Sequence, residues 1–187
     1  MYSMKPQKDQ GITLIELIIV ISIIGILAVA LGFEFNGWMG GYRVESQMKE
    51  LYIDLMNARA RAMERNREHF VTVTATQYTI QEDINPWPDG DNNLTAGDSV
   101  RPAGYNDPIP LLQRNLDPQY PIAWSGGAQI AFTTRGLSTG NRTICSNTTA
   151  GADYNCIEVS ASRINLGRLT TMIPDGGSCD SANCVAR

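Results

Sequence analysis

The most uneven feature of the chain is an apolar run that begins at residue 12. Ile12 to Phe33 are 22 consecutive positions, and Glu16 is the only ionisable side chain among them. As an α-helix this run would measure about 33 Å, at about 1.5 Å per residue, which is enough to cross a bilayer core of about 30 Å. The pattern therefore predicts a membrane-spanning helix over residues 12–36.

A second helical pattern follows the first. Apolar residues recur at spacings of four and three, at Val44, Met48, Leu51, Leu55, Ala58 and Ala62. Such a stripe is typical of an amphipathic helix that packs on its own domain, with mixed charges on the opposite face. Gly37, Gly40 and Gly41 precede the stripe and would permit a bend. We expect this helical continuation over residues 37–68, with its end near Asn66.

Beyond the helix the pattern changes to period two. "HFVTVTATQYTIQED", from His69, predicts a β-hairpin with its turn near Thr76 and Gln77. Later strand candidates are "AQIAFTT", "NRTICS", "CIEVSAS" and "INLGRLTTMI". Residues 84–127 hold most of the prolines and predict a long loop with a short strand or two. The fold class is α+β, a long helix packed on an antiparallel sheet in a β-rich head over residues 69–187.

The distribution of charge predicts the orientation of the chain in the membrane and disfavours some classes of binding partner. Lys5 and Lys8 precede the apolar run and no basic residue follows until Arg43, which places the N-terminus in the cytoplasm and the head outside it. The net charge is -4, and a dedicated nucleic-acid binder usually has a strongly basic face. The arginines that would contact DNA are Arg135, Arg142, Arg163, Arg168 and Arg187. Four carboxylates in the same part of the chain oppose them, so a nucleic-acid partner is disfavoured.

All four cysteines lie in the last quarter of the chain. An even number in a turn-rich tail indicates disulfides formed in an oxidising compartment such as the periplasm. Of the three possible pairings we favour Cys145–Cys156, which would staple a hairpin, with Cys179–Cys184, which would close a small terminal loop. A zinc site is the rival interpretation, but the spacings are not C-x2-C and the only histidine, His69, is distant in sequence.

A cleavable secretory signal is the alternative explanation of the N-terminal run. Residues 1–10 form a basic region, and Ala28-Val29-Ala30 fits the A-x-A cleavage pattern. However, the run is longer than the usual apolar region of about 7–15 residues. It also contains Glu16, and a carboxylate costs about 2–3 kcal/mol toward the centre of a membrane helix, from which a signal peptide gains nothing.

Glu16 gains a purpose if the chain is cut between Gly11 and Ile12. Ile12 would then carry a free α-amine, about one helical turn from the carboxylate. In a bundle of like helices, a neighbour shifted by about a turn would present its own amine to Glu16. Because a buried unpaired charge costs several kcal/mol, this pair would enforce register between subunits more than it adds net stability.

"KDQGITLIELIIVISIIGILA" resembles the class III leader of type IV pilins and type II secretion pseudopilins. The resemblance implies that residues 1–11 are a leader, that a prepilin peptidase cuts after Gly11, and that the new amine of Ile12 is methylated. Ile12 stands where the family usually has Phe or Met. The implied subunit is held in the inner membrane with its head in the periplasm, and an assembly platform then moves it into a filament with other pilins.

The order of the later strands, with "IAFTTRG" before "IEVSASRINLGRL", is similar to GspH/FimT-type minor pilins and pseudopilins. This likeness implies a structural subunit of a type IV pilus or a type II secretion filament. Alternatives are a membrane-anchored or secreted ligand-binding module that uses loop 84–127, and a minor pilin that captures DNA.

The sequence carries no enzyme motif of the G-x-S-x-G, P-loop or H-E-x-x-H kind, so no catalytic residue is expected. His69 is assigned a structural role or a solvated ring. Glu82 and Asp83 lie in a loop-like context, without basic or apolar surroundings that would shift a pKa. Asp89, Asp91 and Asn93 have the spacing of calcium ligands in a loop that is not an EF-hand. A polar turn is the favoured explanation of these residues, and no cofactor or metal is expected.

Overall fold

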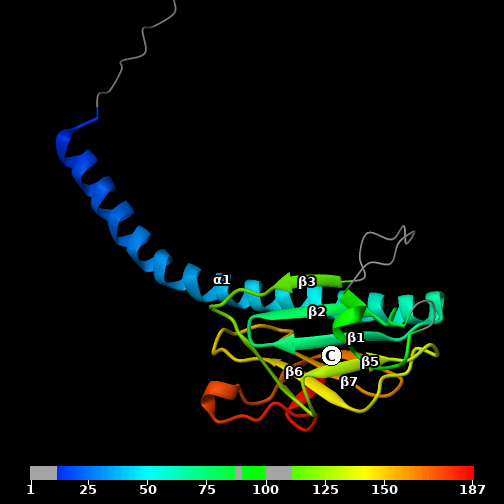
Figure 1. Cartoon of the computed structure of the whole chain (residues 1–187). Helices are drawn as coiled ribbons and strands as arrows, with labels where there is room; N and C mark the ends of the chain where they lie inside the picture. Colours follow the sequence, from blue (N-terminus) through cyan, green and yellow to red (C-terminus); the bar gives the residue numbers. More distant parts are fainter. Residues whose placement is uncertain (1–11, 87–89, 100–110) are drawn as a thin grey trace, which may run out of the picture. The chain divides into compact units, whose positions relative to one another are not determined.

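The computed structural model of the chain describes residues 12–86, 90–99 and 111–187, of which residues 30–37, 99 and 111 are described by their backbone alone. In this part of the chain, one long α-helix is followed by nine strands and two short 3-10 helices, η1 (Ala96–Ser99) and η2 (Ile173–Asp175) (Figure 1). Two compact units, Met1–Met39 and Gly40–Arg187, divide the chain.

The helix α1 (Leu14–Arg65) supplies the backing helix of the second unit. Each side chain of the predicted stripe is at most 1% exposed, namely Val44, Met48, Leu51, Leu55, Ala58 and Ala62. The amphipathic prediction is therefore confirmed. The helix also ends where it was expected to end. Asn66 has a φ of 52°, in the left-handed region that asparagine tolerates better than most residues.

The first sheet has the strand order β3-β2-β1-β5, with antiparallel neighbours throughout. Its strands are β1 (His69–Thr74), β2 (Gln77–Glu82), β3 (Leu111–Asn115) and β5 (Gln129–Phe132). The predicted hairpin is confirmed, because β1 and β2 pair across Ala75 and Thr76. The register sets His69 directly opposite Glu82 at the open end of the hairpin.

The second sheet has the order β4-β6-β7-β8-β9 and is also antiparallel. Its strands are β4 (Ile122–Ser125), β6 (Arg142–Ser146), β7 (Cys156–Val159), β8 (Ile164–Leu169) and β9 (Cys184–Ala186). The α+β class is confirmed, but the strands form two sheets where one was expected. The division arises because β5 returns to pair with β1 while β4 pairs with β6, and alternation along a strand does not encode such distant partners.

A single core cluster joins α1 to both sheets. Tyr78 and Ile130 of the first sheet and Ile144 and Ile157 of the second are at most 1% exposed and belong to the cluster that contains the α1 stripe. In Figure 1 the second half of α1 runs along the sheet of β1, β2 and β3. The open end of the hairpin therefore lies beside the last turn of α1.

The glycines of α1 do not interrupt the helix. The helix is continuous through Gly40 and Gly41, and both are buried. A Cβ at Gly41 would lie 1.8 Å from the carbonyl oxygen of Gly151, so glycine is required there for the close approach of the loop between β6 and β7.

We expect Gly41→Ala to lower the free energy of unfolding by about 1–3 kcal/mol, the usual cost of an overpacked site. The loss should appear even though alanine is the better helix former by about 1 kcal/mol. Urea unfolding of the full chain in detergent measures it. Gly151→Ala is the matched control, because an added Cβ there meets nothing within 4 Å. If Gly41→Ala proves as stable as Gly151→Ala, the packing argument is contradicted.

Candidate functional site

The first candidate site is the start of α1. Ile12 is 76% exposed and immediately precedes the cap residue, while Gly11 lies outside the described residues. The backbone N–H of Glu16 donates to Thr13 Oγ1 at 3.4 Å, and that of Leu17 donates to the Thr13 carbonyl at 3.2 Å. Thr13 is therefore the N-cap of α1. The T-x-x-E pattern from Thr13 to Glu16 is typical of a capping box, but this role was not predicted for Thr13 from the sequence.

This cap gives Glu16 a local function in addition to the predicted one. Its carboxylate lies in the first turn of α1, where the unpaired N–H groups and the helix dipole favour negative charge. The predicted partner of Glu16, the amine of Ile12 on another subunit, stays a prediction.

Residues 12–29, which include the first part of α1, expose apolar side chains around the whole helix. Thirteen of them are between 47% and 76% exposed: Ile12, Leu14, Ile15, Leu17, Ile18, Ile19, Val20, Ile21, Ile23, Ile24, Ile26, Leu27 and Val29. The hydroxyl of Ser22 donates to the carbonyl of Ile18 at 2.7 Å, so this polar group is satisfied within the helix. No helix in the described part of the chain combines the length and the apolar character that a membrane crossing needs.

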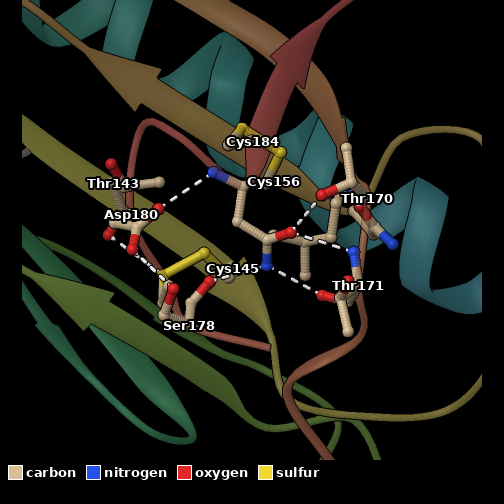
Figure 2. The surroundings of a disulfide bond; sticks show 12 residues. Thr143, Cys145, Cys156, Thr170, Thr171, Ser178, Asp180 and Cys184 are labelled. Carbon is tan, nitrogen blue, oxygen red and sulfur yellow. Dashed lines mark hydrogen bonds between the residues drawn. A yellow bond between two sulfur atoms is a disulfide. The ribbon is translucent and has the colours of Figure 1, made fainter. Parts of the chain in front are cut away.

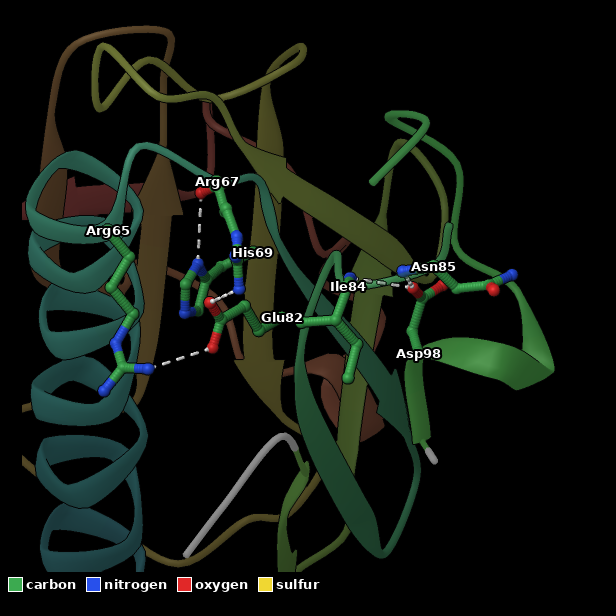
Figure 3. A network of polar contacts seen from close by, with 7 residues as sticks. All are labelled: Arg65, Arg67, His69, Glu82, Ile84, Asn85 and Asp98. Carbon is green, nitrogen blue, oxygen red and sulfur yellow. Dashed lines mark hydrogen bonds and ion pairs between the residues drawn. The ribbon is translucent and has the colours of Figure 1, made fainter. Parts of the chain in front are cut away.

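The second candidate site is a polar cluster at the open end of the β1–β2 hairpin (Figure 3). Glu82 is 3% exposed, and its two carboxylate oxygens accept hydrogen bonds from Arg65 at 3.3 Å and Arg67 at 3.2 Å. His69 is 3% exposed, and its Nδ1 lies 3.3 Å from the carbonyl oxygen of Arg67. The expectation that Glu82 lacks basic surroundings is wrong, because Arg65 at the end of α1 and Arg67 in the connection to β1 both reach it.

Burial lowers the pKa of His69 below its ordinary value, since the charged ring would lose its water. Glu82 opposes this shift, whereas Arg61 and Arg65 add to it. The folded protein therefore binds a proton at His69 less readily than the unfolded chain does. It follows that stability contributed by the neutral ring decreases as the pH falls from about 6.5 toward the folded pKa.

We expect His69→Gln to remove this part of the pH dependence. The free energy of unfolding of the natural chain should fall more steeply between about pH 6.5 and 5 than that of the variant. Urea unfolding at a series of pH values measures both slopes. Carboxylates such as Glu68 and Asp83 titrate equally in the two proteins, so they cancel in the difference. Parallel pH profiles would show that His69 does not titrate differently on folding.

Two buried carboxylates organise the loop after β2. Asp98 accepts hydrogen bonds from the backbone N–H groups of Ile84 and Asn85, both at 3.0 Å, and from Thr95 at 2.6 Å (Figure 3). Asp83 accepts two more, from the N–H groups of residues 91 and 92. The expectation that nothing shifts the pKa of Asp83 is also wrong, because burial raises it.

The proposed calcium ligands divide between described and undescribed residues. Asp91 accepts a hydrogen bond from the backbone N–H of Asn93 at 2.9 Å, which is the geometry of an Asx turn. Asp89 lies outside the described residues. Calcium binding here stays an untested expectation.

The disulfides differ from the predicted pairs. The bonds are Cys145–Cys179 and Cys156–Cys184, and the predicted Cys145–Cys156 and Cys179–Cys184 pairings are wrong. Cys145 and Cys156 are indeed cross-strand partners on β6 and β7. The tail passes over the same end of these strands, and each of its cysteines bonds to one of them (Figure 2). Sequence proximity favoured two local staples, whereas the path of the tail produces two long-range ones.

Hydrogen bonds within the tail keep its cysteines in place. The side-chain amide of Asn183 donates to the carbonyl oxygens of Thr171 at 2.8 Å and Ser178 at 2.7 Å, while its backbone N–H donates to Asp180 at 2.9 Å. Asn183 is 8% exposed, so these contacts satisfy a buried amide.

Several of the arginines considered for DNA make contacts within the head. Arg168 and Arg187 both lie near Asp153, at 3.3 and 3.9 Å. Arg142 donates to the carbonyl oxygens of Gln129 and Asn141. Arg135 and Arg163 are exposed and lie in different turns.

The prokaryotic N-terminal methylation motif matches residues 6–32, and the type II transport protein GspH model matches residues 47–163, which are 117 of the 187 residues. The search of curated proteins found no match.

Solved structures of low identity were also found. The type IV minor pilin FimU of Pseudomonas aeruginosa is 18% identical, with 66% of this chain and 87% of that chain covered and a TM-score of 0.46. The minor pseudopilin EpsH of Vibrio cholerae is 13% identical, with 66% and 95% covered and a TM-score of 0.49. Because the GspH model covers more than half of the sequence and the methylation motif precedes it, the chain belongs to the family of the type II transport protein GspH.

Proposed function

We propose that a prepilin peptidase cuts the chain between Gly11 and Ile12, that the new amine is methylated, and that residues 12–36 anchor the subunit in the inner membrane before it enters a filament. The head then lies in the periplasm, and an assembly platform moves the helix from lipid into a bundle of like helices. The role is structural rather than catalytic. The observation that carries the proposal is the exposed apolar surface around the first turns of α1.

Water is an unfavourable environment for such a surface. Each exposed aliphatic side chain forgoes about 1.5–3 kcal/mol of burial free energy. A helix that packs on its own domain buries one stripe, as the second half of α1 does, but the first turns expose every side. Lipid and a helical bundle both cover all faces of a helix, which fits an anchor that later becomes the centre of a filament.

Transfer from lipid to a helical bundle gains little hydrophobic free energy, because lipid tails are as apolar as leucine. Packing and polar contacts must then determine the arrangement of the subunits. Glu16 is the ionisable group available for this in the apolar run, and Thr13 fixes the turn that carries it. In the proposal, Glu16 pairs with the amine of Ile12 on a neighbouring subunit and sets the axial shift between them.

The disulfides support the proposal that the head lies in the periplasm. Both bonds tie the tail to the second sheet, and disulfides form and persist in the periplasm rather than in the cytosol. The tail therefore reaches its final arrangement after the head has crossed the membrane.

N-terminal sequencing and intact mass of the membrane-extracted protein test the processing step. We expect mature chains to begin at Ile12 with a methylated amine. A start at Leu31 would instead support a secreted domain, and an intact Met1 would support a simple anchor. Gly11→Lys serves as the control, because a bulky charged residue before the cut should leave the leader attached.

A further inference from the structure

A pocket of about 240 Å³ lies between α1 and the first sheet. Ala58 of α1, Ile80 of β2 and Leu112 of β3 provide its apolar lining. Arg61 and His69 are among its polar lining residues. The volume is slightly below the usual range for small-molecule sites, which are about 300–1,000 Å³, and therefore favours a small ligand.

His69 presents an unused hydrogen-bond acceptor in this pocket. The carbonyl oxygen of Arg67 can only accept, so the ring nitrogen 3.3 Å away, Nδ1, carries the proton. The neutral ring then has a lone pair on Nε2, for which the described residues provide no donor. Within the described part of the chain, Ser146 Oγ is the one side-chain polar atom that is sealed from solvent without a hydrogen bond. Nε2 is therefore open to the pocket, although His69 as a whole is only 3% exposed.

The other charged groups leave a cation available. Arg65 and Arg67 neutralise Glu82. Asp54 accepts a hydrogen bond from the Tyr78 hydroxyl at 2.6 Å and lies 3.6 Å from Arg114. Arg61 is exposed and forms no ion pair with any described residue. A ligand in the pocket thus meets the acceptor of His69, the guanidinium of Arg61, which has no ion-pair partner among the described residues, and apolar side chains.

We propose that this pocket binds a small organic acid whose apolar body also carries a hydroxyl or N–H donor. The donor bonds to Nε2 of His69, the carboxylate pairs with Arg61, and the body lies against Ile80 and Leu112. A ligand without the donor leaves Nε2 unsatisfied, and one without the carboxylate leaves Arg61 unpaired. All of the lining residues belong to the unit Gly40–Arg187, so the pocket does not include the apolar run that the proposed filament contacts use.

His69 is the only histidine of the chain, so ¹⁵N-histidine labelling gives one pair of ring-nitrogen signals. We would titrate the labelled full chain in detergent micelles with 4-hydroxybenzoate, which has the required acid, body and donor. The Nε2 resonance should shift in a saturable manner with a Kd of about 1 mM or lower. Benzoate, which lacks the donor, and 4-hydroxybenzamide, which lacks the charge, should each bind about 10-fold more weakly.

Two arginine variants complete the experiment. Arg61→Ala should weaken 4-hydroxybenzoate binding about 10-fold, because it removes the charge partner at an exposed position. Arg135→Ala is the matched control, an exposed arginine outside the pocket, and should bind as the natural chain does. The absence of a saturable shift would overturn the proposal. So would equal affinity for benzoate, or an equal loss in both variants, since either result means that the pocket groups do not select the ligand.

Discussion

The Glu16→Val variant is expected to insert into the inner membrane normally and to be absent from filaments. An isolated subunit gains slightly from losing the carboxylate, because the apolar run becomes uninterrupted. In the bundle, however, the amine of Ile12 on the neighbouring subunit would be buried without a partner, at a cost of about 3–5 kcal/mol. Such a cost reduces incorporation by more than about 100-fold at equilibrium. Immunoblots of membrane fractions and of sheared or purified filaments measure the two outcomes.

A second substitution separates the charge of Glu16 from its place in the helix cap. Glu16→Gln keeps the T-x-x-Q pattern, which also forms a capping box, but removes the charge. If register depends on the ion pair, the Glu16→Gln variant should be excluded from filaments as well. Its normal incorporation would mean that Glu16 acts through the cap at Thr13. Glu64→Gln, an exposed position of α1 far from this turn, controls for an effect of lost charge in general.

The double variant Cys156→Ser, Cys184→Ser is expected to lower the free energy of unfolding of the head by about 2–4 kcal/mol. The bond links residues that are 28 positions apart, and without it the unfolded chain gains conformational entropy. The native state is also destabilised, because Cys156 and Cys184 are 0% and 4% exposed and the serine hydroxyls would be buried in their place. Urea unfolding under non-reducing conditions measures the change.

The other disulfide provides the comparison. Cys145–Cys179 spans 34 residues, so its removal should destabilise the head by a similar amount. Proteolysis followed by mass spectrometry checks the connectivity directly. A peptide in which Cys145 is linked to Cys156 would contradict the observed pairing. An unchanged free energy of unfolding in both double variants would contradict the stabilisation that we assign to the disulfides.

The elements that local patterns encode were predictable. The stripe from Val44 to Ala62 follows the helical period, and the strand from His69 alternates every second residue. Both patterns arise from the side on which a helix or a strand is buried, so they are visible in any short window of sequence. The signal for the start of α1 is equally local, since the capping pattern at Thr13 spans only four residues, although it was not used to predict the cap.

The features that required distant partners were not predictable in the same way. Glu82 was expected to lack basic neighbours because Arg65 and Arg67 are near it only once α1 and β2 have packed. The crossed disulfides depend on the path of the tail across β6 and β7. The pocket at His69 combines residues from α1 and three strands, and no spacing within one element indicates it. Such sites follow from topology, which one-dimensional periodicity does not contain.

The short final strand has a consequence for how these heads behave at high density. β9 pairs with β8 over three residues and is tied at Cys184, so the molecule's own tail covers residues 167–169 of β8. An open strand border invites indiscriminate hydrogen bonding with any extended polypeptide, and a brief terminal strand limits that hazard. At this border of the second sheet, crowded copies are thereby discouraged from pairing strand to strand.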